Sequence, residues 1–190
     1  MTEIREIDHY LKRLAEYLGH EDPVAMQQVT ARTLERLING VPESVLRSKP
    51  EPQKCSVVEI LARLAEDELV TSWRYRQMIE HSGTNMTSFN QDEWARLGDY
   101  GSWEVRAALK MFRLLREANL RLLTRLTSQE WHCDGIHPEL GLMTVMDLAR
   151  HRAAEDIHHM LQIEWILSAS PATEERSLPA TGYSETGSAP

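Results

Sequence analysis

The residues best suited to chemistry lie in residues 144–167, which read TVMDLARHRAAEDIHHMLQIEWIL. Thr144 and Asp147 have the spacing of a helix N-terminal capping box, and no Gly or Pro interrupts the stretch that follows. At about 100° per residue, one face of the predicted helix carries His151, Glu155, His158, His159 and Gln162. The sequence therefore predicts a polar cluster at the edge of a helical core, and this cluster is the first candidate for a functional site.

Glu155 and His159 have the i,i+4 spacing at which two side chains of one helix can bind the same metal ion. His151 lies one turn before them, but the spacing alone identifies no third ligand. The alternative is a solvated polar face, or histidines that are satisfied by hydrogen bonds, and this is the commoner outcome for acid–histidine pairs on helices. The spacing leaves both interpretations open.

The composition is that of one compact soluble domain that needs no disulfides. The chain has 190 residues, of which 42% are hydrophobic and 26% are charged. Its formal net charge is −8, and an acidic surface repels a phosphate backbone, so nucleic-acid binding is disfavoured. Cys55 and Cys133 suit free thiols in a reducing compartment. Neither a signal peptide nor a membrane span is evident, so we expect a cytoplasmic protein without a membrane partner.

The periodicity of apolar residues and the capping signals predict four long helices. The first starts at Asp22-Pro23 and ends at Gly40, the second runs over residues 57–80, the third over 103–126 and the last over 145–167. A short helical turn is expected at residues 43–47, and the long connection over residues 81–101 is expected to cover a site.

These helices predict an all-α fold, an antiparallel four-helix bundle whose site is built from inward-facing side chains. Residues 1–21 are expected to form an accessory helix that packs on the domain or on a second subunit. Residues 22–168 form the bundle, and residues 169–190 are polar enough to be a disordered tail.

About three quarters of the chain resembles the DinB/YfiT-like superfamily of small bacterial four-helix bundles. The segments that carry the resemblance, in the order of the family, are DPVAMQQVTARTLERLINGVP, PEPQKCSVVEILARLAEDELV, SFNQDEW, LKMFRLLREANLRLLTRL, GIHPELG and AEDIHHMLQIEWI. The resemblance implies a divalent metal bound by three histidines, one on the second bundle helix and two on the last. It also implies metal-assisted hydrolysis, or transfer and isomerisation reactions with a low-molecular-weight thiol such as bacillithiol, mycothiol or glutathione.

The chain departs from the family pattern at two of the three ligand positions. Arg63 stands where the second-helix histidine is expected, and Glu155 stands at the first histidine position of the last helix. His159 remains, together with Asp156 and Gln162 of the surrounding motif. An arginine is always protonated and cannot bind a cation. We therefore expect Arg63 and Glu155 to form a charge-assisted pair in place of the ion, and the protein to carry no stoichiometric metal.

The leading interpretation is a small-molecule enzyme that has lost the family metal and performs acid/base chemistry in the bundle cavity. The predicted catalytic residues are His159, Glu155, Arg63, Asp67 and His137. The predicted substrate-binding residues are Arg63, His151, Gln162 and Trp94. A transferase, hydrolase, isomerase or cyclase would fit equally well.

Two alternatives stay open. One is a metal-dependent thiol S-transferase or hydrolase with a rearranged site. In it, Glu155 and His159 would hold zinc, nickel or iron together with His151, Asp67 or His137. The other is a non-catalytic ligand-binding or structural protein. We prefer the enzyme because a core without function would be more stable with apolar side chains. The expected partners are a small-molecule substrate and a second copy of the chain in a homodimer.

Overall fold

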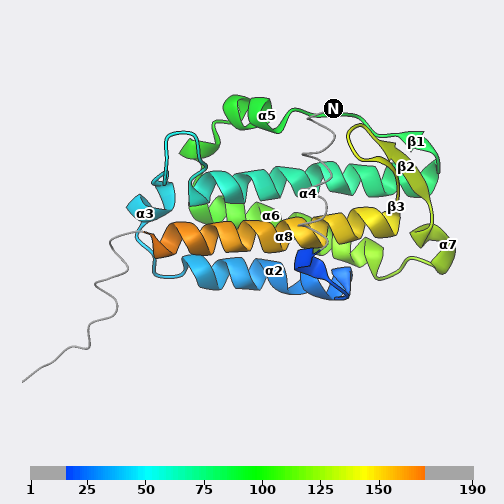
Figure 1. Ribbon diagram of the computed structural model, residues 1–190, viewed down its shortest axis with the longest axis horizontal. Helices are drawn as coiled ribbons and strands as arrows, with labels where there is room; N and C mark the ends of the chain where they lie inside the picture. Colours follow the sequence, from blue (N-terminus) through cyan, green and yellow to red (C-terminus); the bar gives the residue numbers. More distant parts are fainter. Residues whose placement is uncertain (1–15, 170–190) are drawn as a thin grey trace, which may run out of the picture.

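The structure is a computed structural model that describes residues 16–169, and it is built around four long helices (Figure 1). The bundle helices are α2 (Pro23–Ile38), α4 (Val57–Glu80), α6 (Val105–Leu123) and α8 (Val145–Ser168). The connections hold α3 (Glu43–Arg47), α5 (Gln91–Leu97), η1 (Tyr100–Ser102) and α7 (Ser128–Trp131). The four-helix bundle predicted from the sequence is confirmed.

The helices of the bundle run as two pairs. α2 and α8 point one way, while α4 and α6 point the other way (Figure 1). Helices are therefore parallel within each pair and antiparallel between the pairs. α6 runs parallel to α4 because the long connection after α4 returns the chain to the end at which α4 began. The short connection through α3 and the hairpin before α8 reverse the chain direction in the ordinary way.

The helix starts follow from local capping. Ser56 with Glu59 and Thr144 with Asp147 form complete capping boxes at α4 and α8, as the sequence predicts. The third long helix differs from its prediction at both ends, since it begins at Val105 and ends at Leu123. Its N-cap is Glu104, whose side chain accepts a hydrogen bond from a backbone N–H of the first turn, and residues 100–102 form a 3₁₀ turn instead.

A small three-stranded sheet closes one end of the bundle, and the all-α prediction did not include it. Its strands are β1 (Thr84–Asn85), β2 (Asp134–His137) and β3 (Gly141–Thr144), with β1 parallel to β2 and β2 antiparallel to β3. Gly141 opposes His137 in the β2–β3 register and has a φ of 74°, a conformation that glycine adopts without strain. The hairpin brings His137 from the end of β2 to the bundle.

The apolar core fills the length of the bundle, but a buried polar network crosses its centre. Arg116 of α6 lies between two carboxylates, with Nη2 2.8 Å from Glu68 Oε1 and 2.8 Å from Asp156 Oδ1. Asn119 also donates to Glu68, and Thr30 of α2 donates to Asp156, so all four helices contribute. Burial alone would lower the pKa of Arg116, yet the carboxylates of Asp156 and Glu68 raise it above its ordinary value.

Most of the predicted accessory helix and nearly all of the predicted tail lie outside the described residues. Within them, Leu18 is buried against Ala153 and Ala154 of α8, and Arg150 donates a hydrogen bond of 2.8 Å to the Gly19 carbonyl. The chain before α2 therefore contacts the last helix. None of the helices described has the length and apolar character required to cross a bilayer.

Candidate functional site

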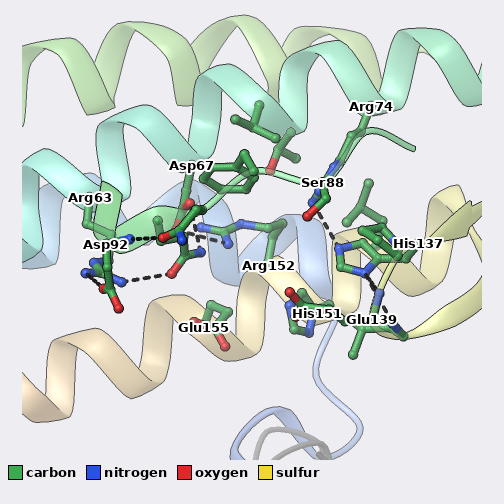
Figure 2. Close-up of a pocket in the computed structure, with 18 residues that line it drawn as sticks. Arg63, Asp67, Arg74, Ser88, Asp92, His137, Glu139, His151, Arg152 and Glu155 are labelled. Carbon is green, nitrogen blue, oxygen red and sulfur yellow. Dashed lines mark hydrogen bonds and ion pairs between the residues drawn. The ribbon is translucent and has the colours of Figure 1, made fainter. Parts of the chain in front are cut away.

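A cavity of about 480 Å³ lies between α4 and α8 (Figure 2). Its remaining walls are the β2–β3 hairpin and the cover loop, which we define as residues 87–92 leading from β1 into α5. The predicted role of this connection as a cover is supported, because residues 88–92 line the cavity. The lining side chains are Arg63, Asp67, Val70, Thr71, Arg74, Ser88, Phe89, Asn90, Gln91, Asp92, His137, Pro138, Glu139, Leu140, Leu148, His151, Arg152 and Glu155.

Helical spacing explains how α4 and α8 supply the charged walls. Residues 63, 67, 70, 71 and 74 recur at three- and four-residue intervals on α4, and residues 148, 151, 152 and 155 do so on α8. Each set therefore occupies one face of its helix, and the two faces meet across the cavity (Figure 2).

Five of the residues predicted to form the site line this cavity, namely Arg63, Asp67, His137, His151 and Glu155. Three others, His159, Gln162 and Trp94, do not line it. His159 lies behind Glu155, with its Nε2 3.5 Å from Glu155 Oε2 and its Nδ1 3.1 Å from Gln162 Oε1. Trp94 makes an edge-to-face contact with Phe89 of the cover loop, with 5.0 Å between the ring centroids.

The predicted ion pair between Arg63 and Glu155 does not form. Arg63 instead places Nη2 3.0 Å from Asp92 Oδ1 and donates a hydrogen bond of 2.9 Å from Nη1 to Gln91 Oε1. The cover loop folds over this part of α4 and provides the nearer acceptors. Burial lowers the pKa of Arg63, but the hydrogen bond to Asp92 and the charges of Cys55, Asp92 and Asp67 together outweigh burial, so the pKa is raised. Arg63 therefore fastens the cover loop at the rim of the cavity.

Arg152 is a site residue that sequence reasoning missed. Its Nη1 lies 3.5 Å from Asp67 Oδ2, and both side chains are buried. The Nε and Nη2 atoms of Arg152 have no hydrogen-bond partner in the described structure. The sequence did contain a sign of this role. Arg152 lies between Ala149 and Ala153 on the apolar side of the helix, where an arginine is rarely buried unless it has a partner.

Arg74 was also missed, and it holds the other end of the cavity. Its Nη1 lies 3.0 Å from His137 Nε2, and its Nη2 donates to the Thr87 carbonyl at 3.2 Å. On the other side of the ring, the backbone N–H groups of Glu139 and Leu140 donate to His137 Nδ1 at 3.2 Å each. Both ring nitrogens of His137 thus lie within hydrogen-bond distance of donors, and the neutral ring can accept at one of them. His137 therefore links the hairpin to Arg74 of α4.

Two cavity histidines are held in the neutral form at pH 7. Burial and then the charge of Arg74 lower the pKa of His137 from 6.5 to about 4. Burial lowers the pKa of His151 to about 3, with further contributions from Arg152, His137 and Arg74. The positive charge of the cavity at neutral pH therefore comes from its arginines.

These two histidines predict that stability falls with acidification. Between pH 6.5 and about 4 the unfolded chain binds protons at these imidazoles that the folded chain does not bind, so the free energy of unfolding decreases as the pH falls. The expected slope is up to about 1.4 kcal/mol per pH unit for each imidazole. Urea titrations from pH 7.5 to 4.5 measure the slope.

The double variant His137→Asn/His151→Asn should show a clearly shallower slope over this interval. His81, which is 74% exposed at its side chain, provides the matched control, and His81→Asn should follow the wild-type curve. An unchanged slope in the double variant would show that carboxylates alone cause the acid sensitivity.

A charged cavity between two facing helices is the arrangement in which four-helix bundles house their ligand and catalytic sites. The family model of the DinB superfamily matches residues 25–163, and the chain belongs to this superfamily. The fold is similar to that of YfiT from Bacillus subtilis, described as a probable metal-dependent hydrolase with an unusual four-helix bundle topology. The TM-score is 0.72 at 16% identity, over 77% of this chain and 84% of that chain, a likeness that shows the fold. A search of curated proteins found no significant match.

The side chains at the site do not fit the metal that the superfamily resemblance implies. At the three ligand positions, Arg63 is a cation bound to Asp92, Glu155 faces the cavity, and His159 lies behind Glu155. Within residues 16–169, no three His, Cys, Asp or Glu side chains are grouped so that they could hold a metal ion. The rearranged set of Glu155, His159 and His151 is therefore not assembled as a ligand cluster. The metal content itself stays a prediction.

Proposed function

We propose that the protein is a small-molecule enzyme of the DinB superfamily that performs acid/base chemistry in the cavity between α4 and α8, with Glu155 as the general base. One observation carries the proposal. Glu155 is 7% exposed, and its Oε1 atom has no hydrogen-bond partner among the described residues. Leaving a buried acceptor unsatisfied costs about 1–3 kcal/mol, and more when the group is charged. A carboxylate oxygen kept free at this cost supports a role in accepting a proton from a bound ligand.

The other residues take roles that follow from their contacts. Asp67 and Arg152 pair across the cavity and fix one another, while Arg63 holds the cover loop through Asp92. His159, which was predicted to be the acid/base group, contacts Glu155 from behind and is better assigned as a positioning residue. A transferase, hydrolase, isomerase or cyclase can each use such a base, and a thiol substrate would be deprotonated in the same way.

The proposal includes the loss of the family metal, and elemental analysis tests that part. Protein purified without chelator is expected to contain far less than one zinc, nickel or iron ion per chain, because Arg63 places a fixed positive charge at a ligand position. Addition of EDTA should leave the thermal midpoint unchanged. About one tightly held ion per chain would overturn this part and favour the metal-dependent alternative.

The experiment that tests the enzymatic role is a turnover screen. Wild-type protein and the Glu155→Gln variant are incubated with an extract of small bacterial metabolites, and mass spectrometry follows the compounds that are consumed and formed. The proposal expects conversions that occur with the wild type and not with the variant. Identical metabolite profiles for the two proteins would contradict it.

A binding protein without turnover is the second candidate, and one observation favours it. His137 has both ring nitrogens engaged, and the low pKa values of His137 and His151 leave neither as a proton donor at pH 7. A cavity whose histidines cannot act as acids at this pH can bind a ligand without transforming it. Ligand binding that depends on Arg152 and Glu155, without any conversion of the ligand, would establish this second function.

A further inference from the structure

Arg152 lines the cavity and keeps two buried donor atoms without a partner. Its Nη1 faces Asp67, whereas Nε and Nη2 have no partner, and its side chain is 7% exposed. Nε and Nη2 lie on the same edge of the planar guanidinium, and their N–H groups are parallel. This edge matches the two oxygen atoms of one carboxylate. Arg152 therefore holds a buried two-pronged donor site without an acceptor.

Arg116 shows how this protein provides hydrogen-bond partners for a buried arginine with a structural role. Both terminal nitrogens of Arg116 bond carboxylate oxygens, from Glu68 and Asp156, and only its Nε lacks a partner. Arg152 is also buried, but only its Nη1 has a carboxylate, that of Asp67, and its Nη2 has no partner. Because unpaired buried donors are costly, the contrast indicates that the acceptor for Arg152 is a ligand that enters the cavity.

Glu155 supplies the complementary feature one helical turn away. Its Oε1 is unpartnered and it lines the same cavity, but its ion-pair contact is with His159 and not with Arg152. Side chains at i and i+3 are about 5–6 Å apart at their Cβ atoms. Figure 2 shows the Arg152 side chain lying between Asp67 on one side and His151 and Glu155 on the other. Two side chains that line one cavity thus hold a buried donor pair and a buried acceptor without partners.

The balance of charge in the interior selects among ligands. The buried charged side chains of the lining are Arg74 and Arg152, with two positive charges, and Asp67 and Glu155, with two negative charges. Of the other charged lining residues, Arg63 pairs with Asp92 at the rim and Glu139 is exposed. A ligand with no net charge preserves this balance, whereas a phosphate dianion would add two uncompensated charges in a partly buried space. The ligand must also bring one negative group for Arg152 and one donor for Glu155.

We infer that the cavity recognises a zwitterionic α-amino acid, with its carboxylate on the Nε–Nη2 edge of Arg152 and its ammonium group on Oε1 of Glu155. The inference rests on the proposed function in taking this cavity as the ligand site. The volume of about 480 Å³ accommodates an amino acid, and Val70, Phe89 and Leu148 offer an apolar wall to its side chain. The contact with Glu155 also presents an N–H proton to the proposed base.

The test is calorimetric and thermal-shift titration of the wild-type protein with the twenty amino acids, followed by the des-amino carboxylic acid that matches the best binder. Inorganic phosphate is titrated in parallel. We expect an amino acid to bind at least about tenfold more tightly than its des-amino analogue, because the analogue leaves Glu155 unpaired. Equal binding of the analogue, stronger binding of phosphate, or no binding by any amino acid would overturn the inference.

Variants identify the two contacts. Arg152→Lys keeps the charge beside Asp67 but removes the planar edge, and we expect at least about tenfold weaker amino-acid binding. Glu155→Gln should remove the preference for the amino acid over its des-amino analogue. Arg150→Gln changes an arginine of the same helix that does not line the cavity, and it should bind like the wild type. Thermal denaturation of each variant verifies that it is folded, and unaltered binding by folded Arg152→Lys would contradict the assignment.

The outcomes separate the inference from the proposed function. Amino-acid binding without any turnover would support the inference and count against the enzyme. Turnover of metabolites that lack the amino acid group would support the enzyme and overturn the inference.

Discussion

Replacing Arg116 with methionine is expected to lower the free energy of unfolding by about 3–5 kcal/mol. The guanidinium is almost completely buried and is the common partner of Glu68 and Asp156, which are themselves buried. Methionine fills a similar volume but leaves both carboxylates in the core without the ion-pair partner that they share. Such a loss is a large part of the stability of a domain of this size. Urea denaturation followed by circular dichroism measures the change.

A matched control lies one turn earlier on the same helix. Arg113 is exposed, and Arg113→Met should change the free energy of unfolding by no more than about 0.5 kcal/mol. Adding Glu68→Gln and Asp156→Asn to Arg116→Met should recover part of the loss, because the isolated charges are then removed. A loss below about 1 kcal/mol for Arg116→Met would mean that the carboxylates find other partners or take up protons at little cost.

The second large effect is expected at Glu155. Once the turnover screen identifies a substrate, Glu155→Gln should lower kcat by about 10²- to 10⁴-fold, the usual contribution of a general base. The amide has the shape of the carboxylate but cannot accept the proton. Because the wild-type Oε1 has no hydrogen-bond partner to lose, the variant should stay folded. Steady-state kinetics with thermal denaturation of the same samples measures both properties.

Glu164→Gln is the control for this prediction. Glu164 lies on α8, two to three turns after Glu155, and it is exposed. Its variant should keep the wild-type kcat. If Glu155→Gln raises KM and leaves kcat unchanged, Glu155 binds the substrate without acting as its base, and the ligand-binding function becomes the better description.

The two substitutions at the family ligand positions have separate consequences in this chain. Arg63 serves the cover loop through Asp92 and Gln91, whereas Glu155 faces the interior of the cavity. From the sequence, Arg63 and Glu155 were expected to form one ion pair in place of the metal ion. In the structure Arg63 pairs with Asp92, Arg152 pairs with Asp67, and Oε1 of Glu155 has no hydrogen-bond partner among the described residues.

Local chemistry determined which segments are helical and where most of them start. Helix capping acts within a few residues, so it can be predicted from neighbouring positions in the sequence. The examples are the capping boxes at Ser56 and Thr144 and the first-turn Pro23. The third long helix was predicted to begin at residue 103, since the Ser102 before it is a residue type that caps helices well, but the chain uses Glu104 as the cap. Periodicity likewise placed Glu155 and His151 on one face of the last helix.

Tertiary structure alone decided the partner of each charged side chain. Whether Arg63 meets Glu155 or Asp92 depends on the path of a connection more than twenty residues away, and no local spacing encodes that path. The sheet escaped prediction for a similar reason, since strands of two and four residues are defined by hydrogen bonds between distant segments. Arg152 and Arg116 look alike in the sequence, as arginines within helices. Only the packing of four helices gives Arg116 two carboxylate partners and Arg152 one, because ion pairing across a bundle depends on how each helix is rotated against its neighbours.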